Sequence, residues 1–155
     1  MKARTILILT LALCFIGVGV CFANDLNLGT WKLNELKSKV PPGVTKNVTV
    51  VYETVGDEIK VTTDGTDKDG QPSHTEWTGR FDGKDYPLTG DPTADSRSYK
   101  KIDALRLAIN NKKNGKVTVS GHIILSADGK SRTLNLTGTD SAGKKVSSTA
   151  VYDKQ

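Results

Sequence analysis

The sequence predicts an all-β domain built as an antiparallel up-and-down meander of about eight to ten strands. Two observations carry this prediction: apolar and polar residues alternate with period two in many short runs of residues 24–155, and glycine-containing pairs separate the runs. Strands joined by such short turns are antiparallel neighbours. We expect the meander to close into a barrel, which removes exposed edges. The alternative is a two-sheet sandwich, which needs longer connections than this chain offers.

Each expected strand carries one face of mostly apolar residues and an opposite polar face. In chain order these faces hold Val48, Val50 and Tyr52; Ile59, Val61 and Thr63; Thr75, Trp77, Gly79 and Phe81; Leu105, Leu107 and Ile109; Val117, Val119, Gly121, Ile123 and Leu125; and Leu134, Leu136 and Gly138. A last strand is expected at about residues 145–153. The expected hairpin turns are Gly56-Asp57, Asp69-Gly70, Asp82-Gly83, Asn114-Gly115, Asp128-Gly129 and Ala142-Gly143.

Residues 1–23 have the pattern of a cleavable signal peptide. Lys2 and Arg4 give a positive start, residues 6–20 are apolar, and Ala23 ends a short exit of small residues. The apolar run is shorter than the roughly 20 residues that span a bilayer, so we expect cleavage and no stable membrane insertion afterwards. The sequence therefore predicts a periplasmic or secreted protein whose single domain is residues 24–155.

Cleavage would remove Cys14 and Cys21, leaving a domain without cysteine. Such a domain depends on its core and not on disulfides. The formal net charge of the whole chain is +5, and loss of Lys2 and Arg4 lowers it by two. The remaining charges alternate in sign and form no basic stripe, so we expect no nucleic-acid partner.

The opening of the predicted domain carries the motif GTWKL at residues 29–33. It resembles the G-x-W start of lipocalins and of cytosolic fatty-acid-binding proteins. The resemblance implies a lipocalin-like barrel in which Trp31 plugs the closed end and Gly29 lets the chain pass close to it. In lipocalins an arginine from a late strand often covers this tryptophan, and Arg132 is the residue we assign to that position.

The stretch STAVYDK at residues 148–154 is similar to the closing strand of fatty-acid-binding proteins. That family holds a carboxylate with an arginine two residues before the tyrosine, whereas Ala150 stands there in this chain. Tyr152 alone cannot supply the positive charge. The two-helix lid of that family is also missing, because only residues 38–46 separate the first two strands. The chain further resembles exported bacterial proteins of unassigned function that share a GTWKLN opening and an FDGKDYP hairpin.

The lipocalin-like interpretation predicts a binding protein for a small apolar or amphipathic molecule. An alkyl chain gains about 0.8 kcal/mol for each buried methylene, even without a paired head group. The residues expected to line the site are Trp77, Phe81, Ile109, Leu125 and Tyr152. The alternative is a barrel filled by its own side chains. It would act as an envelope-associated interaction module through the hairpins at residues 64–73 and 81–91.

Catalytic and metal motifs are not found in the sequence. His74 and His122 are the two near-neutral bases, and most of the carboxylates stand beside turn glycines. Residues 64–76 superficially match a calcium loop, but we interpret them as a solvated hairpin turn. We therefore expect no metal, no cofactor and no enzymatic activity. An enzyme that uses carboxylates at the barrel mouth is the third hypothesis. The sequence leaves the oligomeric state open.

Overall fold

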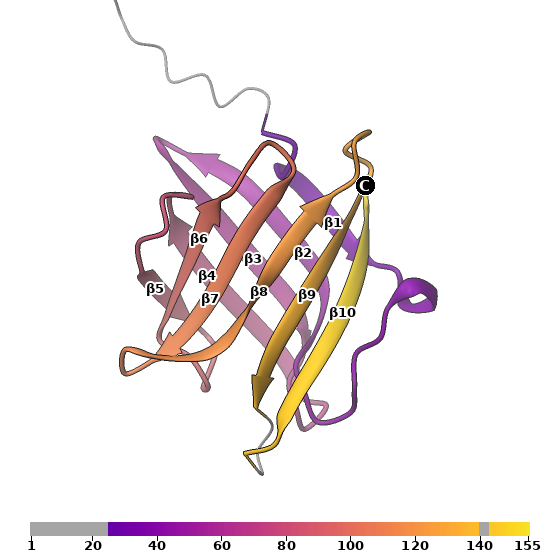
Figure 1. Cartoon of the computed structure of the whole chain (residues 1–155), viewed down its shortest axis with the longest axis vertical. Coiled ribbons are helices and arrows are strands. Elements are labelled where there is room, and N and C mark those ends of the chain that lie inside the picture. The colour runs from indigo at the N-terminus through magenta and orange to yellow at the C-terminus, as the bar shows by residue number, and fades with distance from the viewer. Residues whose placement is uncertain (1–24, 140–142) are drawn as a thin grey trace, which may run out of the picture.

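The computed structural model describes residues 25–139 and 143–155, which form a closed barrel of ten antiparallel strands (Figure 1). The predicted all-β meander is confirmed, and the chain forms a barrel and not a sandwich. The predicted signal peptide, residues 1–23, and Ala142 of the predicted last turn lie outside the described residues. The strands are β1 (Gly29–Leu33), β2 (Lys46–Val55), β3 (Glu58–Thr66), β4 (Pro72–Gly79), β5 (Tyr86–Thr89), β6 (Ser96–Lys101), β7 (Arg106–Lys113), β8 (Lys116–Leu125), β9 (Ser131–Thr139) and β10 (Lys145–Lys154).

The barrel closes where β1 pairs with β10, with Trp31 opposite Lys154 and Leu33 opposite Tyr152. Every other strand pairs with its neighbours in the sequence, as expected of an up-and-down barrel. Between β1 and β2 the described chain forms η1 (Glu35–Lys37), a single 3-10 turn, and one isolated bridge between Lys39 and Thr149. In the described part of the chain, no helix has the length and apolar character needed to cross a membrane.

Turn chemistry explains the hairpins. At the β7–β8 turn Asn114 has φ 50° and Gly115 has φ 76°, the left-handed conformations that a tight hairpin requires. The acidic segment between β3 and β4 is also a hairpin. There the Asp67 carboxylate accepts the backbone N–H groups of Asp69 at 2.9 Å and Gln71 at 2.8 Å. The carboxylate of Asp67 thus stabilises the turn itself.

Three local features differ from the sequence-based expectation. Val48 does not share the inner face of Val50, because a β-bulge between Asn47 and Thr49 leaves it without a partner and 39% exposed. Phe81 lies beyond the end of β4, in the connection to β5. The strands β5 and β6 have no clear apolar alternation in the sequence, since β5 is very short and β6 reads SRSYKK.

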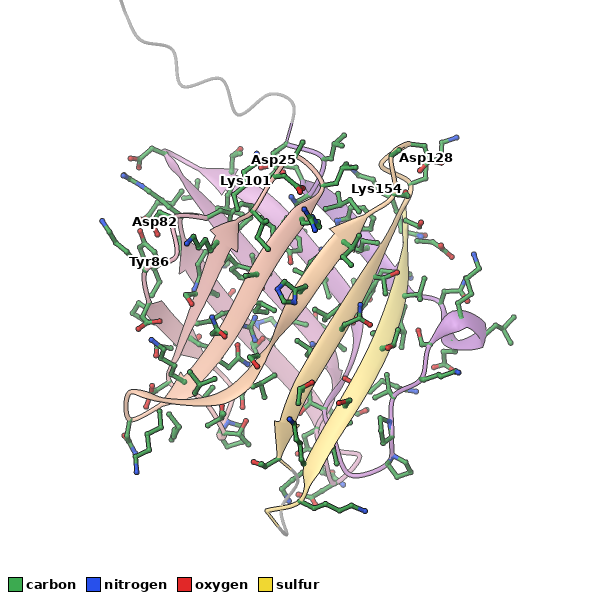
Figure 2. All side chains as sticks on the ribbon, viewed as in Figure 1. Asp25, Asp82, Tyr86, Lys101, Asp128 and Lys154 are labelled. Atoms are coloured by element: carbon green, nitrogen blue, oxygen red, sulfur yellow. The ribbon has the colours of Figure 1, made fainter. Side chains whose placement is uncertain are left out.

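One end of the barrel is sealed by the segment before β1, and we call it the plugged end. Trp31 is fully buried there, and its indole N–H donates to the backbone oxygen of Asn27 at 2.8 Å. The Nζ of Lys154 donates to the Leu26 oxygen at 3.1 Å and lies 5.1 Å from the centroid of the Trp31 ring. Figure 2 shows Asp25, Lys101 and Lys154 gathered at this end. The opposite end is therefore the one where a cavity can open.

Candidate functional site

A cavity of about 380 Å³ occupies the barrel interior on the side away from the plugged end. Its rim is formed by three connections: residues 43–45 between β1 and β2, residues 67–69 between β3 and β4, and residues 90–93 between β5 and β6. We call this part of the interior the hollow half. The filled half contains large buried residues that do not line the cavity, among them Trp31, Ile59, Val61, Trp77, Leu107, Leu125 and Tyr152.

The cavity wall includes a continuous set of aliphatic side chains besides its polar residues. The strands β2, β7, β8 and β9 supply inward-facing side chains because alternate residues of each strand point into the barrel. These side chains belong to Val50, Ile109, Ile123, Leu134 and Leu136. Val50, Ile109 and Ile123 are almost fully buried, whereas Leu134 and Leu136 are only partly covered. The wall of β9 therefore presents apolar surface that the protein itself leaves unpacked.

Tyr52 and Tyr99 form the base of the cavity, where the hollow half meets the filled half. The Tyr99 ring packs edge-on against Trp77 with centroids 4.8 Å apart, and Tyr52 packs against Tyr99 at 6.4 Å. Phe81 joins this aromatic cluster by stacking on Trp77 at 6.3 Å. Edge-to-face and offset-stacked pairs at these separations are favourable. The base is thus a packed aromatic surface.

Arg132 also lines the base of the cavity and is almost completely buried. Its guanidinium carbon lies 4.7 Å from the centroid of the Trp31 ring, 4.7 Å from that of Tyr52 and 5.0 Å from that of Tyr152. These rings stabilise the cation through their π faces. Nevertheless, the Nε and Nη1 atoms are buried and have no hydrogen-bond partner among the described residues.

A second buried arginine, Arg97, lies on the cavity wall beside Asn111. The two residues are directly opposite on β6 and β7, and Arg97 Nε donates to Asn111 Oδ1 at 2.7 Å. Arg97 Nη1 makes only a long contact, 3.4 Å, to the Tyr99 hydroxyl. The Asn111 contact orients the guanidinium and leaves its Nη1 and Nη2 edge without a strong partner in the described chain.

The two arginines have no negatively charged neighbour in the interior of the described barrel. Burial raises the pKa of Tyr152 to about 12 and raises the pKa of Tyr52 well above its usual range. The positive charge of Arg132 opposes this rise in both pKa values but is the smaller effect. Both phenols are therefore neutral at pH 7. Within residues 25–139 and 143–155, the buried polar and charged residues include no carboxylate: they are Asn27, Thr63, Thr75, Arg97, Ser98, Asn111 and Arg132. In the buried interior of the described chain, the two arginine charges are therefore not paired with a carboxylate.

The residues predicted from the sequence divide between the two halves. Of the five predicted to line a ligand site, Ile109 lines the cavity, whereas Trp77, Phe81, Leu125 and Tyr152 do not. The structure brings the three predicted plug residues to the plugged end, with Arg132 over Trp31 and Gly29 in a left-handed conformation at φ 108°. A role for any of these residues in binding stays a prediction.

Sequence reasoning missed Arg97 and Asn111. The period-two alternation carries a signal for Asn111, which is in phase with Leu107 and Ile109, but only a weak one for Arg97, which is in phase with Tyr99 alone. These inward positions are polar, which contrasts with the apolar residues that normally fill a small barrel.

The fold and cavity together define a closed up-and-down β-barrel with an internal chamber, and comparisons with known proteins add no family. No family model matches the chain, and no curated protein matches it. Among solved structures the chain is similar to a redesigned β-barrel, b11L5F_LGL, with 16% identity, a TM-score of 0.43, and coverage of 84% of this chain and 92% of the other. It is also similar to a redesigned β-barrel, mFAP1, bound to DFHBI, with 17% identity, a TM-score of 0.44, and coverage of 83% and 95%.

Proposed function

We propose that this chain is an exported, lipocalin-like small-molecule-binding protein, not an enzyme, and that it holds an apolar or amphipathic molecule inside the barrel. The observation that carries the proposal is the cavity of about 380 Å³, whose wall includes several aliphatic side chains. Ligand pockets in proteins typically measure about 300–1,000 Å³ and are mainly apolar. A barrel acting only through its surface has no need of such a space.

The partly covered side chains on β9 explain why binding of an apolar group in the cavity would be favourable. Leu134 and Leu136 line the cavity without being fully packed by the protein. An alkyl group of six methylenes would gain about 5 kcal/mol on burial against such a wall, before the entropic costs of association. That contribution is enough for a medium-length hydrocarbon group to bind appreciably.

Export is supported by the amino-terminal pattern alone. Lys2, Arg4, the apolar residues 6–20 and the small residue Ala23 fit a signal peptide. We expect the protein recovered from the exported fraction of its own host to begin at Asn24. An intact mass that still includes residues 1–23 would contradict the predicted cleavage.

Native mass spectrometry of that exported protein, purified gently, tests the binding function. We expect a stoichiometric small molecule that is released and identified on activation. The purified, delipidated barrel should also take up the neutral fluorescent probe N-phenyl-1-naphthylamine. An unliganded mass together with no probe uptake would contradict the proposal and direct attention to the surface hairpins.

A pair of variants on one strand locates the bound probe. Leu134→Trp places bulk in the cavity and should reduce probe uptake by about tenfold or more, because the apolar wall is no longer available. Thr133→Trp, the adjacent position on the same strand, faces the other side and is the matched control. Equal uptake by both variants would show that the probe binds outside the barrel.

A further inference from the structure

The interior of the described barrel combines two buried arginines with an absence of buried carboxylates. Arg97 is 8% exposed and Arg132 is 3% exposed, and both line the cavity. The ion pairs of the described chain involve neither residue. A buried charge without a partner is strongly unfavourable, so proteins usually pair it or expose it to a bound ion. In this barrel no side chain of the described chain forms an ion pair with either arginine.

The two arginines differ in what they can offer to a ligand. Three aromatic rings surround Arg132, and its Nε and Nη1 atoms are sealed from the cavity and unpartnered. It therefore contributes positive potential and not a donor edge. Arg97 is held through Nε by Asn111, which leaves Nη1 and Nη2 for an incoming group. Asn111 accepts that bond through Oδ1, so its amide nitrogen is a further donor on the same wall.

Three carboxylates also line the cavity, at its rim, but none of them forms an ion pair with Arg97 or Arg132. Asp67 accepts hydrogen bonds from the backbone of its own turn, and Asp69 pairs with Lys68 at 2.7 Å. Asp91 accepts from the backbone N–H and the hydroxyl of Thr93 at 2.8 Å and 2.7 Å. Asp69 is exposed and Asp67 and Asp91 are partly buried at the rim, whereas the arginines lie in the buried interior.

We propose that the molecule bound in the cavity carries one anionic head group, a carboxylate, sulfate or sulfonate, and that Arg97 binds this group while the aliphatic wall holds the apolar body. The inference rests on the function proposed above and narrows its ligand to amphipathic anions. A planar guanidinium can donate two parallel hydrogen bonds to such a group. The site differs from the carboxylate site that the fatty-acid-binding resemblance implies, because that position holds Ala150.

Two fluorescent probes with the same ring system test the charge. N-phenyl-1-naphthylamine is neutral, and 1-anilinonaphthalene-8-sulfonate adds a single sulfonate to the same skeleton. We expect the mature barrel to bind the sulfonate at least about tenfold more tightly than the neutral probe. Arg97→Gln should weaken sulfonate binding by about tenfold to a hundredfold, the effect of one charged hydrogen bond, and leave the neutral probe within about twofold.

Matched variants separate this effect from a general loss of charge or of folding. Arg97→Lys should recover part of the lost affinity for the sulfonate, because the positive charge is retained. Arg106→Gln removes an arginine that is exposed and paired with Asp103, so it should change neither probe. If Arg97→Gln weakens both probes equally while its circular dichroism is unchanged, the anionic site is wrong and the cavity remains. If neither probe binds the wild-type barrel, the proposed function fails as well.

A displacement experiment tests the anionic site on the wild-type protein, so its result does not depend on whether a variant folds. Dodecanoate and 1-dodecanol have the same hydrocarbon chain and differ in head group. We expect dodecanoate to displace N-phenyl-1-naphthylamine at about tenfold lower concentration than the alcohol. Equal potency of the two, with displacement complete, would overturn the anionic site and leave apolar binding intact.

Discussion

The filled half and the hollow half of the barrel share one strand alternation but differ in the size of their inward side chains. β4 shows the contrast within a single strand, since Trp77 is packed in the filled half while Ser73 and Thr75 line the cavity. On β9 the last inward position, which lines the cavity, is Gly138, a residue without a side chain. The same fold can therefore be solid or hollow, and the volumes of a few alternate residues decide which.

Truncation of matched leucines should give the largest difference between the two halves. Leu107 is 1% exposed in the filled half, so Leu107→Ala should lower the free energy of unfolding by about 2–5 kcal/mol, because it leaves a void. Leu136 already faces the cavity, and Leu136→Ala should cost about 1 kcal/mol. Urea unfolding of the ligand-free proteins measures both. Equal losses would show that the hollow half is packed in solution.

Alkaline pH should destabilise the filled half through Tyr152. Its folded-state pKa is raised to about 12 by burial, whereas the unfolded value is about 10. The contribution to stability is complete below pH 10 and decreases as pH rises towards 12, because the unfolded state loses its proton first. The expected loss from Tyr152 is about 2 kcal/mol by pH 12.

The variant Tyr152→Phe is the comparison for this titration. It loses the hydrogen bond from the Tyr152 hydroxyl to the Asn47 oxygen, 3.0 Å, and should be about 1 kcal/mol less stable at pH 7. Its stability should then fall less steeply than that of the wild type between pH 10 and 12. Parallel curves for the two proteins in urea unfolding would contradict the assignment.

Gly29→Ala should have the smallest of these effects and tests the plugged end. Gly29 has φ 108°, a conformation that residues with a Cβ adopt only with strain of about 1 kcal/mol or more. Thr30→Ala, one residue further along β1, is the control and should change the free energy of unfolding by less than about 0.5 kcal/mol. Chemical unfolding again gives the measurement. An unchanged midpoint for Gly29→Ala would mean that the segment rearranges without cost.

The fold could be predicted because its signals are local. Period-two alternation marks the inner face of a strand, and pairs such as Asn114-Gly115 mark a hairpin. The position of a residue along the barrel axis has no such signal, since it depends on strand tilt and register across the whole sheet. Trp77 and Leu125 were therefore recognised as inward but not as members of the filled half.

The charged part of the candidate site was harder to predict for a different reason. Arg97 lies on β6, where polar residues on both faces conceal the alternation. Its side chain contacts Asn111 on the neighbouring strand β7 as well as Tyr99 on its own strand. The prediction for Val48 was wrong in the opposite sense. Val48 fits the apolar pattern of an inward residue, but the bulge beside it shifts the register and leaves it exposed. Neither outcome can be read from one strand alone.

The pairing of β1 with β10 also has a consequence for the order of folding. Trp31 belongs to the first strand, and Lys154, the residue directly opposite it, belongs to the last. The seal around Trp31 includes Arg132 from β9 as well. Contacts between such distant parts of a chain are slow to form. A nascent chain consequently cannot close its barrel until β10 has been synthesised, and up to that moment both edges of the sheet stay unpaired.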